Sequence, residues 1–212
     1  SGNTFVGWNW RANGGTTSSN TTGAITSTVQ VDPSGSFSIV KYTGESATKT
    51  VGHGLSAAPY MMIIKALNNT YNWGVYNTAM GLNALKLNSD AAQDTGASTL
   101  WGNTHPTSSV FSVGDGSETG KSVDYIAYCF ANCEGYIKAG SYEGNGNADG
   151  TFVYTGFRPA FIICKSLDST SDWQMFDNKR EGYNVDNNEL QANESDAEAT
   201  TELVFEAFEP DG

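Results

Sequence analysis

Three tryptophans are the side chains best suited to bind a ligand. Trp8 and Trp10 lie two residues apart on an expected strand and therefore point to the same face. Trp101 lies in the loop "LWGNTHP", which has no counterpart elsewhere in the chain. An indole ring combines a flat apolar face with one polar group, so an exposed one suits a sugar ring. We predict that Trp101 is exposed and treat Trp101, Trp8 and Trp10 as candidate ligand-binding residues.

A second candidate site is the loop "EGNGNADG", which places oxygen-bearing side chains at every second position. This spacing resembles the first half of a calcium loop. The twelfth position of such a loop needs a bidentate acid, and here it is Tyr154. Asn and Gly at the tip of a β-hairpin explain the same residues. Both interpretations stay open, and the candidate calcium ligands are Glu143, Asn145, Asn147 and Asp149.

The sequence offers no catalytic set. His53 lies between two glycines without a nucleophile elbow nearby, and a turn residue is its simpler interpretation. A glycosidase-type carboxylate pair leaves no fixed spacing in a sequence, so it stays open as a minor alternative. Neither histidine has zinc-site spacing to a cysteine, and we interpret Cys129, Cys133 and Cys164 as buried apolar residues. We therefore expect no enzyme activity and no cofactor other than the calcium considered above.

The elements that must position these residues are set by an internal repeat. "KYTG" at 41–44 matches "SYEG" at 141–144, and the run that begins at Pro59 matches the run that begins at Pro159. Both matches have an offset of 100 residues. Trp73 and Trp173 occupy equivalent positions in this repeat, which predicts that both rings are core residues. We predict two tandem homologous units.

A second match has an offset of 120 residues and places an insertion in the first unit. "FVGWNWRANGG" from Phe5 matches "YIAYCFANCEG" from Tyr125. If each unit opens with this strand, the surplus lies in the polar stretch of about residues 16–36, as an inserted loop or edge hairpin. The predicted units are then 1–123 and 124–212. The second lacks its closing strand, which indicates that the chain is a segment of something longer.

The fold class follows from short β-rich runs separated by Gly, Asn, Asp and Pro. This spacing predicts an all-β fold of antiparallel β-sandwich or jelly-roll type with very little helix. The run "YMMIIK" is continuously apolar, which predicts a central strand covered on both faces. For the tail at 196–205 we expect two helical turns.

Charge and hydropathy exclude some partners. The net charge is −12, with 23 acidic and 11 basic residues, which argues against nucleic acid and anionic membranes. The apolar run Tyr60 to Ile64 is far too short to cross a bilayer, so we expect no membrane insertion. The acids after Arg180 form a solvated face or a cation or partner site.

Taken together, the motifs resemble a family. "FVGWNWRANGGTTSSNTTGAITSTV", "SFSIVKYTG", "TVGHGLSAAPYMMIIK" and the long block from Tyr125 to Lys165 resemble a duplicated domain in virion structural proteins of marine bacteriophages. The resemblance covers nearly the whole chain. It implies a tail-fibre-like or other particle-surface location and carries no catalytic residues. The chain departs from the pattern at Cys133, usually apolar, and in its acidic tail.

The resemblance implies a bacteriophage virion structural protein, a tail-fibre or surface-fibre domain that acts in assembly and host-surface attachment. Its expected partners are other virion proteins, copies of itself and a host cell-surface glycan. A homo-oligomer is expected, and a trimer would suit a fibre. One alternative is a carbohydrate-binding module or adhesin domain that uses Trp101 or Trp8. The other is a glycan-degrading enzyme.

Overall fold

The computed structural model describes residues 5–147, 150–180 and 186–205. In these ranges the chain forms β-strands and two short 3₁₀ turns, η1 (Thr78–Met80) and η2 (Ala97–Trp101). Every pair of strands is antiparallel. The predictions of an all-β fold and very little helix are confirmed. None of the described residues belongs to a helix long and apolar enough to span a bilayer.

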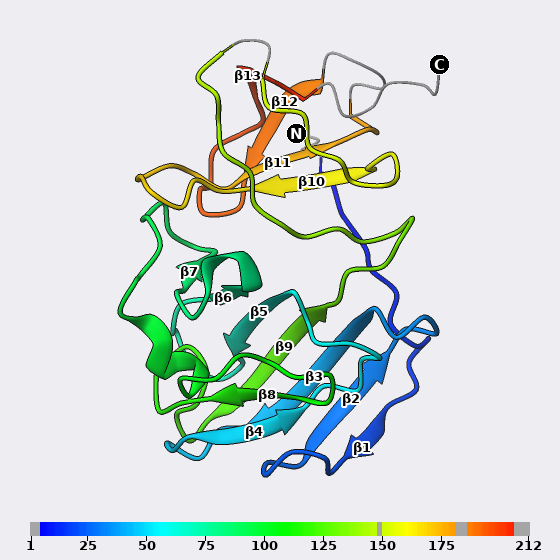
Figure 1. Ribbon diagram of the computed structural model, residues 1–212, viewed down its shortest axis with the longest axis vertical. Helices are drawn as coiled ribbons and strands as arrows, with labels where there is room; N and C mark the ends of the chain where they lie inside the picture. Colours follow the sequence, from blue (N-terminus) through cyan, green and yellow to red (C-terminus); the bar gives the residue numbers. More distant parts are fainter. Residues whose placement is uncertain (1–4, 148–149, 181–185, 206–212) are drawn as a thin grey trace.

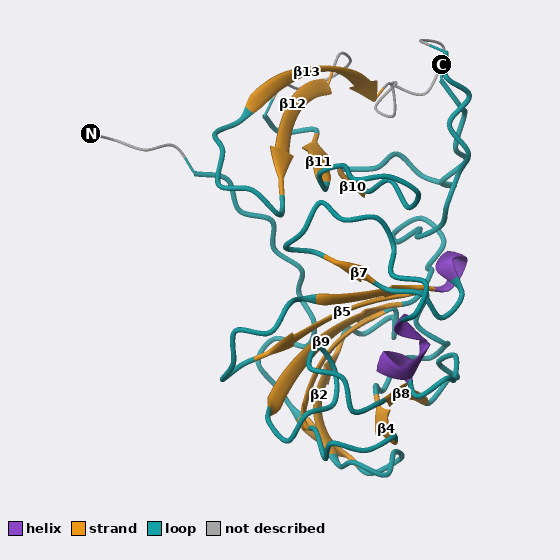
Figure 2. Ribbon diagram, turned by 90° about the vertical axis from the view of Figure 1, so that its left-hand side faces the viewer, coloured by secondary structure: helices purple, strands orange, loops and turns teal. Residues whose placement is uncertain are grey.

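The larger sheet has seven strands in the order β1-β2-β3-β9-β5-β6-β7 (Figure 1). Their bounds are Ser18–Asn20, Ser27–Val31, Phe37–Thr43, Asp124–Phe130, Met61–Ala66, Gly74–Asn77 and Leu85–Lys86. A two-stranded sheet of β4 (Lys49–Gly52) and β8 (Val110–Val113) covers one face. Figure 2 shows β4, β8 and a 3₁₀ turn beside β8 on that side, and η2 is the turn that contacts β8. The first part of the chain is therefore two-layered.

The core lies between these two layers. Val40, Ile64 and Ala127 from the large sheet and Val51 and Phe111 from the small one are fully buried in a single cluster. Burying a Val, Ile or Phe side chain of this cluster stabilises the fold by about 1.5–3 kcal/mol. This cluster is the main source of stability in the first part of the chain.

The strand expected to open the second unit is the centre of the first sheet. β9 pairs with β3 along one edge, from Phe37 opposite Phe130, and with β5 along the other, from Met61 opposite Phe130. The expected boundary between residues 123 and 124 would therefore cut through the first sheet. The reason is that β9 pairs between β3 and β5, two strands that lie much earlier in the sequence. A division of the sequence into consecutive units does not reveal this pairing.

The polar stretch expected to be inserted lies at the edge of the large sheet. Residues 18–20 and 27–31 form the hairpin β1–β2, and β2 pairs with β3. The turn from β2 to β3 is organised by Asp32, whose Oδ1 accepts from the main-chain N–H groups of Ser36 at 2.8 Å and Phe37 at 2.7 Å. A carboxylate with several such donors fixes the turn.

A second sheet of four strands packs on the far face of the first. Its order is β10-β11-β12-β13, with bounds Phe161–Cys164, Gln174–Asp177, Asp186–Gln191 and Ala199–Phe205. Ile163 and Trp173 of this part join Met61, Ile63 and Val75 of the first in one apolar cluster. Both faces of β5 are therefore covered, as its continuous apolar run predicts. The expected helical turns at 196–205 are wrong, because Ala199–Phe205 pairs with β12.

The corners β5–β6–β7 and β10–β11–β12 have the same hydrogen bonds. The N–H of Trp73 donates to Asn88 Oδ1 at 2.9 Å, and that of Trp173 donates to Asn193 Oδ1 at 2.8 Å. The carbonyls of these two tryptophans accept from Leu87 and Ala192. Lys65 Nζ bonds the carbonyl of Asn69, and Lys165 Nζ that of Ser169. The two lysines therefore close loops rather than face a site.

Candidate functional site

Trp101 is in the core, so the prediction that it is exposed is wrong. Only 1% of its surface is accessible. The turn η2 carries the ring inward, where it meets Tyr76 edge-on with ring centroids 5.3 Å apart. The indole Nε1 donates to the carbonyl of Asn83 at 3.2 Å. A buried ring of this kind does not stack on a sugar, and its role here is packing.

Sequence reasoning missed the polar pair beside Trp101. The Tyr76 hydroxyl and His105 Nδ1 are 2.8 Å apart. Burial raises the pKa of Tyr76 above its ordinary value, so its hydroxyl is protonated and can donate to His105. The pair lies far apart in sequence and has no motif, so no signal in the sequence could have identified it.

His53 is also buried, with 0% of its surface accessible. Its Nδ1 accepts from the N–H of Leu55 at 3.0 Å, and its Nε2 lies 3.1 Å from the carbonyl of Thr107. Burial lowers the pKa of His53, which favours the neutral ring with its proton on Nε2. Both ring nitrogens are occupied by the main chain, which agrees with a turn residue.

Trp8 and Trp10 lie together on the second sheet. Their rings are 5.2 Å and 5.4 Å from the Phe161 ring. Trp10 keeps 41% of its surface accessible, and Trp8 is half-buried. Both rings contact Phe161, but the strand expected at these residues is wrong, because residues 5–10 are not part of a strand. The two rings instead hold the N-terminal residues against β10.

The Trp8 indole also joins an ionic group on β11. Its Nε1 donates to Asp177 Oδ2 at 3.0 Å, and Arg180 Nε donates to the same oxygen at 2.8 Å. Arg180 also pairs with Glu198 at 2.6 Å. Burial alone would raise the pKa of Asp177, but bonds from Arg180, the Lys179 N–H and Trp8, with the charge of Arg180, lower it. This group of hydrogen bonds therefore holds the N-terminal residues on the second sheet.

The candidate calcium residues lie in a long exposed loop. Glu143, Asn145 and Asn147 are exposed, and Asp149 lies outside the described residues. The N–H of Asn147 donates to Asn145 Oδ1 at 3.0 Å, and Thr151 Oγ1 donates to the Glu143 carbonyl at 2.6 Å. These bonds are typical of turns. Within the described part of the chain no three His, Cys, Asp or Glu side chains are grouped to hold a metal.

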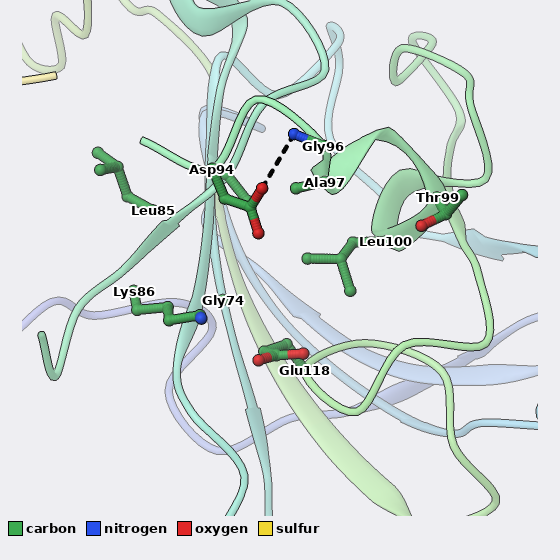
Figure 3. Close-up of a pocket in the computed structure, with 10 residues that line it drawn as sticks. Gly74, Leu85, Lys86, Asp94, Gly96, Ala97, Thr99, Leu100 and Glu118 are labelled. Carbon is green, nitrogen blue, oxygen red and sulfur yellow. Dashed lines mark hydrogen bonds between the residues drawn. The ribbon is translucent and has the colours of Figure 1, made fainter. Parts of the chain in front are cut away.

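A cavity lies beside β6 and β7 (Figure 3). It measures about 180 Å³, below the roughly 300–1,000 Å³ of most ligand pockets. Asp94 and Glu118 line it from different sides, and Lys86 of β7 lies beside its pairing partner Gly74. Asp94 Oδ1 accepts from the Gly96 N–H at 2.9 Å, and Glu118 Oε2 accepts from Ser117 Oγ at 2.8 Å. Both carboxylates have structural partners.

Several exposed aromatic side chains lie in the same long loop as the calcium candidates. Phe152 is 86% and Tyr154 is 76% exposed, and Val153 and Tyr142 are also open to solvent. Exposed apolar side chains in a group mark interaction surfaces more often than isolated ones do. The run "TFVY" has a strand-like composition, so its exposure could not be predicted from the sequence.

A family model described as a domain of unknown function (DUF7483) matches residues 1–207. Neither the curated proteins nor the solved structures gave a match.

Proposed function

We propose that this chain, which belongs to the DUF7483 family, is a structural protein of a bacteriophage virion, a tail-fibre or surface-fibre domain. It acts by assembly and by attachment to the host surface rather than by catalysis. The observation that carries the proposal is the resemblance of the block Tyr125–Lys165 and the flanking motifs to phage virion proteins. Its location is then the particle surface or tail, with other virion proteins and copies of itself as partners.

The architecture agrees with this role. A chain that is only 16% charged and is built from strands and long polar loops is compatible with a structural role, because one all-β fold can serve structural proteins as well as enzymes and binding modules. We further propose that the chain contains two copies of one unit. Support comes from the offset of 100 residues and from the bonds that recur at Trp73 and Trp173.

Within this proposal the surface that meets the host is the loop with Phe152 and Tyr154. Their exposure favours contact with a glycan, because aromatic faces stack on the apolar faces of sugars. The same observation supports the second candidate function, a carbohydrate-binding module or adhesin. Trp101 is excluded from this surface by its burial.

Mass spectrometry of density-purified phage particles tests virion membership. We expect peptides of this chain at a copy number comparable with other fibre proteins. Their absence from particles, with presence in the infected-cell lysate, would overturn the proposal.

Glycan-array binding tests whether the loop with Phe152 and Tyr154 is the surface that binds the host glycan. We expect Phe152→Ala and Tyr154→Ala to reduce binding to host polysaccharide at least tenfold, while Leu67→Ala, at an exposed apolar side chain outside this loop, leaves it unchanged. Equal binding by all three variants would remove the loop as the attachment surface.

A further inference from the structure

The strand β10 has an open edge. It pairs with β11 on one side, and among the described residues no strand pairs with its other side. The corresponding strand of the large sheet, β5, is paired on both sides, with β6 and with β9. Ile162 and Cys164 are only half-buried, whereas their counterparts Met62 and Ile64 are fully buried. An unpaired edge of this kind readily accepts another strand.

The sequence contains a strand of the right kind at its beginning. Phe5–Trp10 matches β9 from Tyr125 to Phe130 at the offset of 120 residues. In the large sheet, Phe130 of β9 lies opposite Met61 of β5. β9 corresponds to residues 5–10 by the offset of 120, and β5 corresponds to β10 by the offset of 100. The same register therefore places Trp10 opposite Phe161 and Gly7 opposite Cys164.

Two contacts already lie where this register requires them. The rings of Trp10 and Phe161 are 5.4 Å apart, within the range of an aromatic pair and within reach of directly opposite residues. Trp8 contacts the same ring at 5.2 Å, as a diagonal neighbour does. The bond from Trp8 Nε1 to Asp177 Oδ2 holds this segment on the second sheet. Residues 5–10 therefore already contact the second sheet through the side chains of Trp8 and Trp10, although their main chain is not paired with β10 as a strand.

We propose that the open edge of β10 is a strand-accepting site and that its occupant is residues 5–10 of the same chain. The added strand runs antiparallel to β10 in the register that β9 has on β5. It covers the half-buried face at Ile162 and Cys164 and ties the beginning of the chain to its second sheet. This inference does not depend on the virion proposal, because it rests on the repeat and on the contacts of Trp8 and Trp10.

Disulfide trapping tests the register. In a chain with Cys133→Ser, the variant Gly7→Cys places a thiol opposite native Cys164, where mild oxidation should form a bond within one chain. Val6→Cys is the matched control, because its side chain points to the other face of the strand. We expect at least tenfold more intrachain disulfide in the first variant than in the control, measured by peptide mass spectrometry.

Each outcome decides the proposal. A disulfide between two chains, seen as a dimer without reductant, would overturn the assignment to the same chain and make a second copy the occupant. Equal trapping of both variants would overturn the register. Hydrogen exchange gives a second readout in the intact chain: amides of 161–164 should lose protection in the Trp8→Ser/Trp10→Ser variant while β5 keeps its own. Unchanged exchange at β10 would overturn the site.

Discussion

The indole Nε1 of Trp173 donates a hydrogen bond to the main-chain carbonyl of Lys86 at 2.9 Å. Lys86 lies on β7, the edge of the seven-stranded sheet, and Trp173 immediately precedes β11. The bond lies at the rim of the apolar cluster that contains Trp173, Val75 and Leu85. The Trp173 side chain therefore packs between the two sheets. Its indole N–H also provides a hydrogen-bond donor for a main-chain carbonyl on an edge strand.

Trp173→Ala should strongly weaken this contact. Removing a buried tryptophan costs about 3–5 kcal/mol of the free energy of unfolding. Trp173→Phe keeps most of the packing and loses the bond to Lys86, so it should cost only about 1 kcal/mol. Urea unfolding followed by circular dichroism measures both. Trp73→Ala, at the half-buried counterpart, is the control and should lose less than Trp173→Ala; an equal loss would argue against the contact as described.

Trp101→Ala should destabilise the first part of the chain by about 3–5 kcal/mol, because it removes a ring buried against Tyr76. Trp10→Ala, at a half-exposed ring, should cost less than half as much. Thermal unfolding compares the two variants. A Trp101→Ala protein with wild-type stability would mean that the ring is not in the core.

Stability should decrease as the pH falls below about 6.5, because His53 is buried in its neutral form. Burial lowers the pKa of His53 below its ordinary value of 6.5, so the unfolded chain binds the proton first. The folded state is therefore favoured above pH 6.5 and loses this advantage as the pH falls toward the lowered pKa. The expected slope is at most about 1.4 kcal/mol per pH unit.

His53→Asn tests the origin of that slope. The amide oxygen can still accept from the Leu55 N–H, but the residue no longer titrates. The variant should be less stable at pH 8 and should show a flatter profile between pH 6.5 and 5. Parallel profiles for wild type and His53→Asn would contradict the assignment.

Asp177→Asn should destabilise the chain by about 1–3 kcal/mol at pH 7, because the ion pair with Arg180 and the other bonds to the carboxylate are weakened. The folded pKa of Asp177 lies below its ordinary value of 3.8. Its contribution is therefore present above pH 3.8 and is lost as the pH falls through the lowered pKa. Urea unfolding at pH 7 and pH 2 should show the difference shrinking; Asp168→Asn, at an exposed acid, is the control. A constant difference would contradict this account.

The sequence predicted what depends on composition and local pattern. The all-β class and the doubly covered strand β5 follow from turn residues and from the apolar run at Met61–Ala66. The placement of β9 between β3 and β5 could not be predicted, because strand order depends on contacts between distant segments.

The candidate site was harder to predict than the fold. Trp101 lies in a loop without a counterpart, which suggested exposure, yet η2 turns the ring into the core. Phe152 and Tyr154 have the composition of a strand and are nevertheless exposed. The difference between a buried and an exposed aromatic is decided by tertiary packing, which local composition does not report.

Immunogold electron microscopy of purified phage particles tests the central proposal most directly. An antibody against this chain should label the tail tips or fibre ends, at several sites on each particle. Label over the head or within the tail would contradict host attachment, and particles without label would contradict the virion proposal itself.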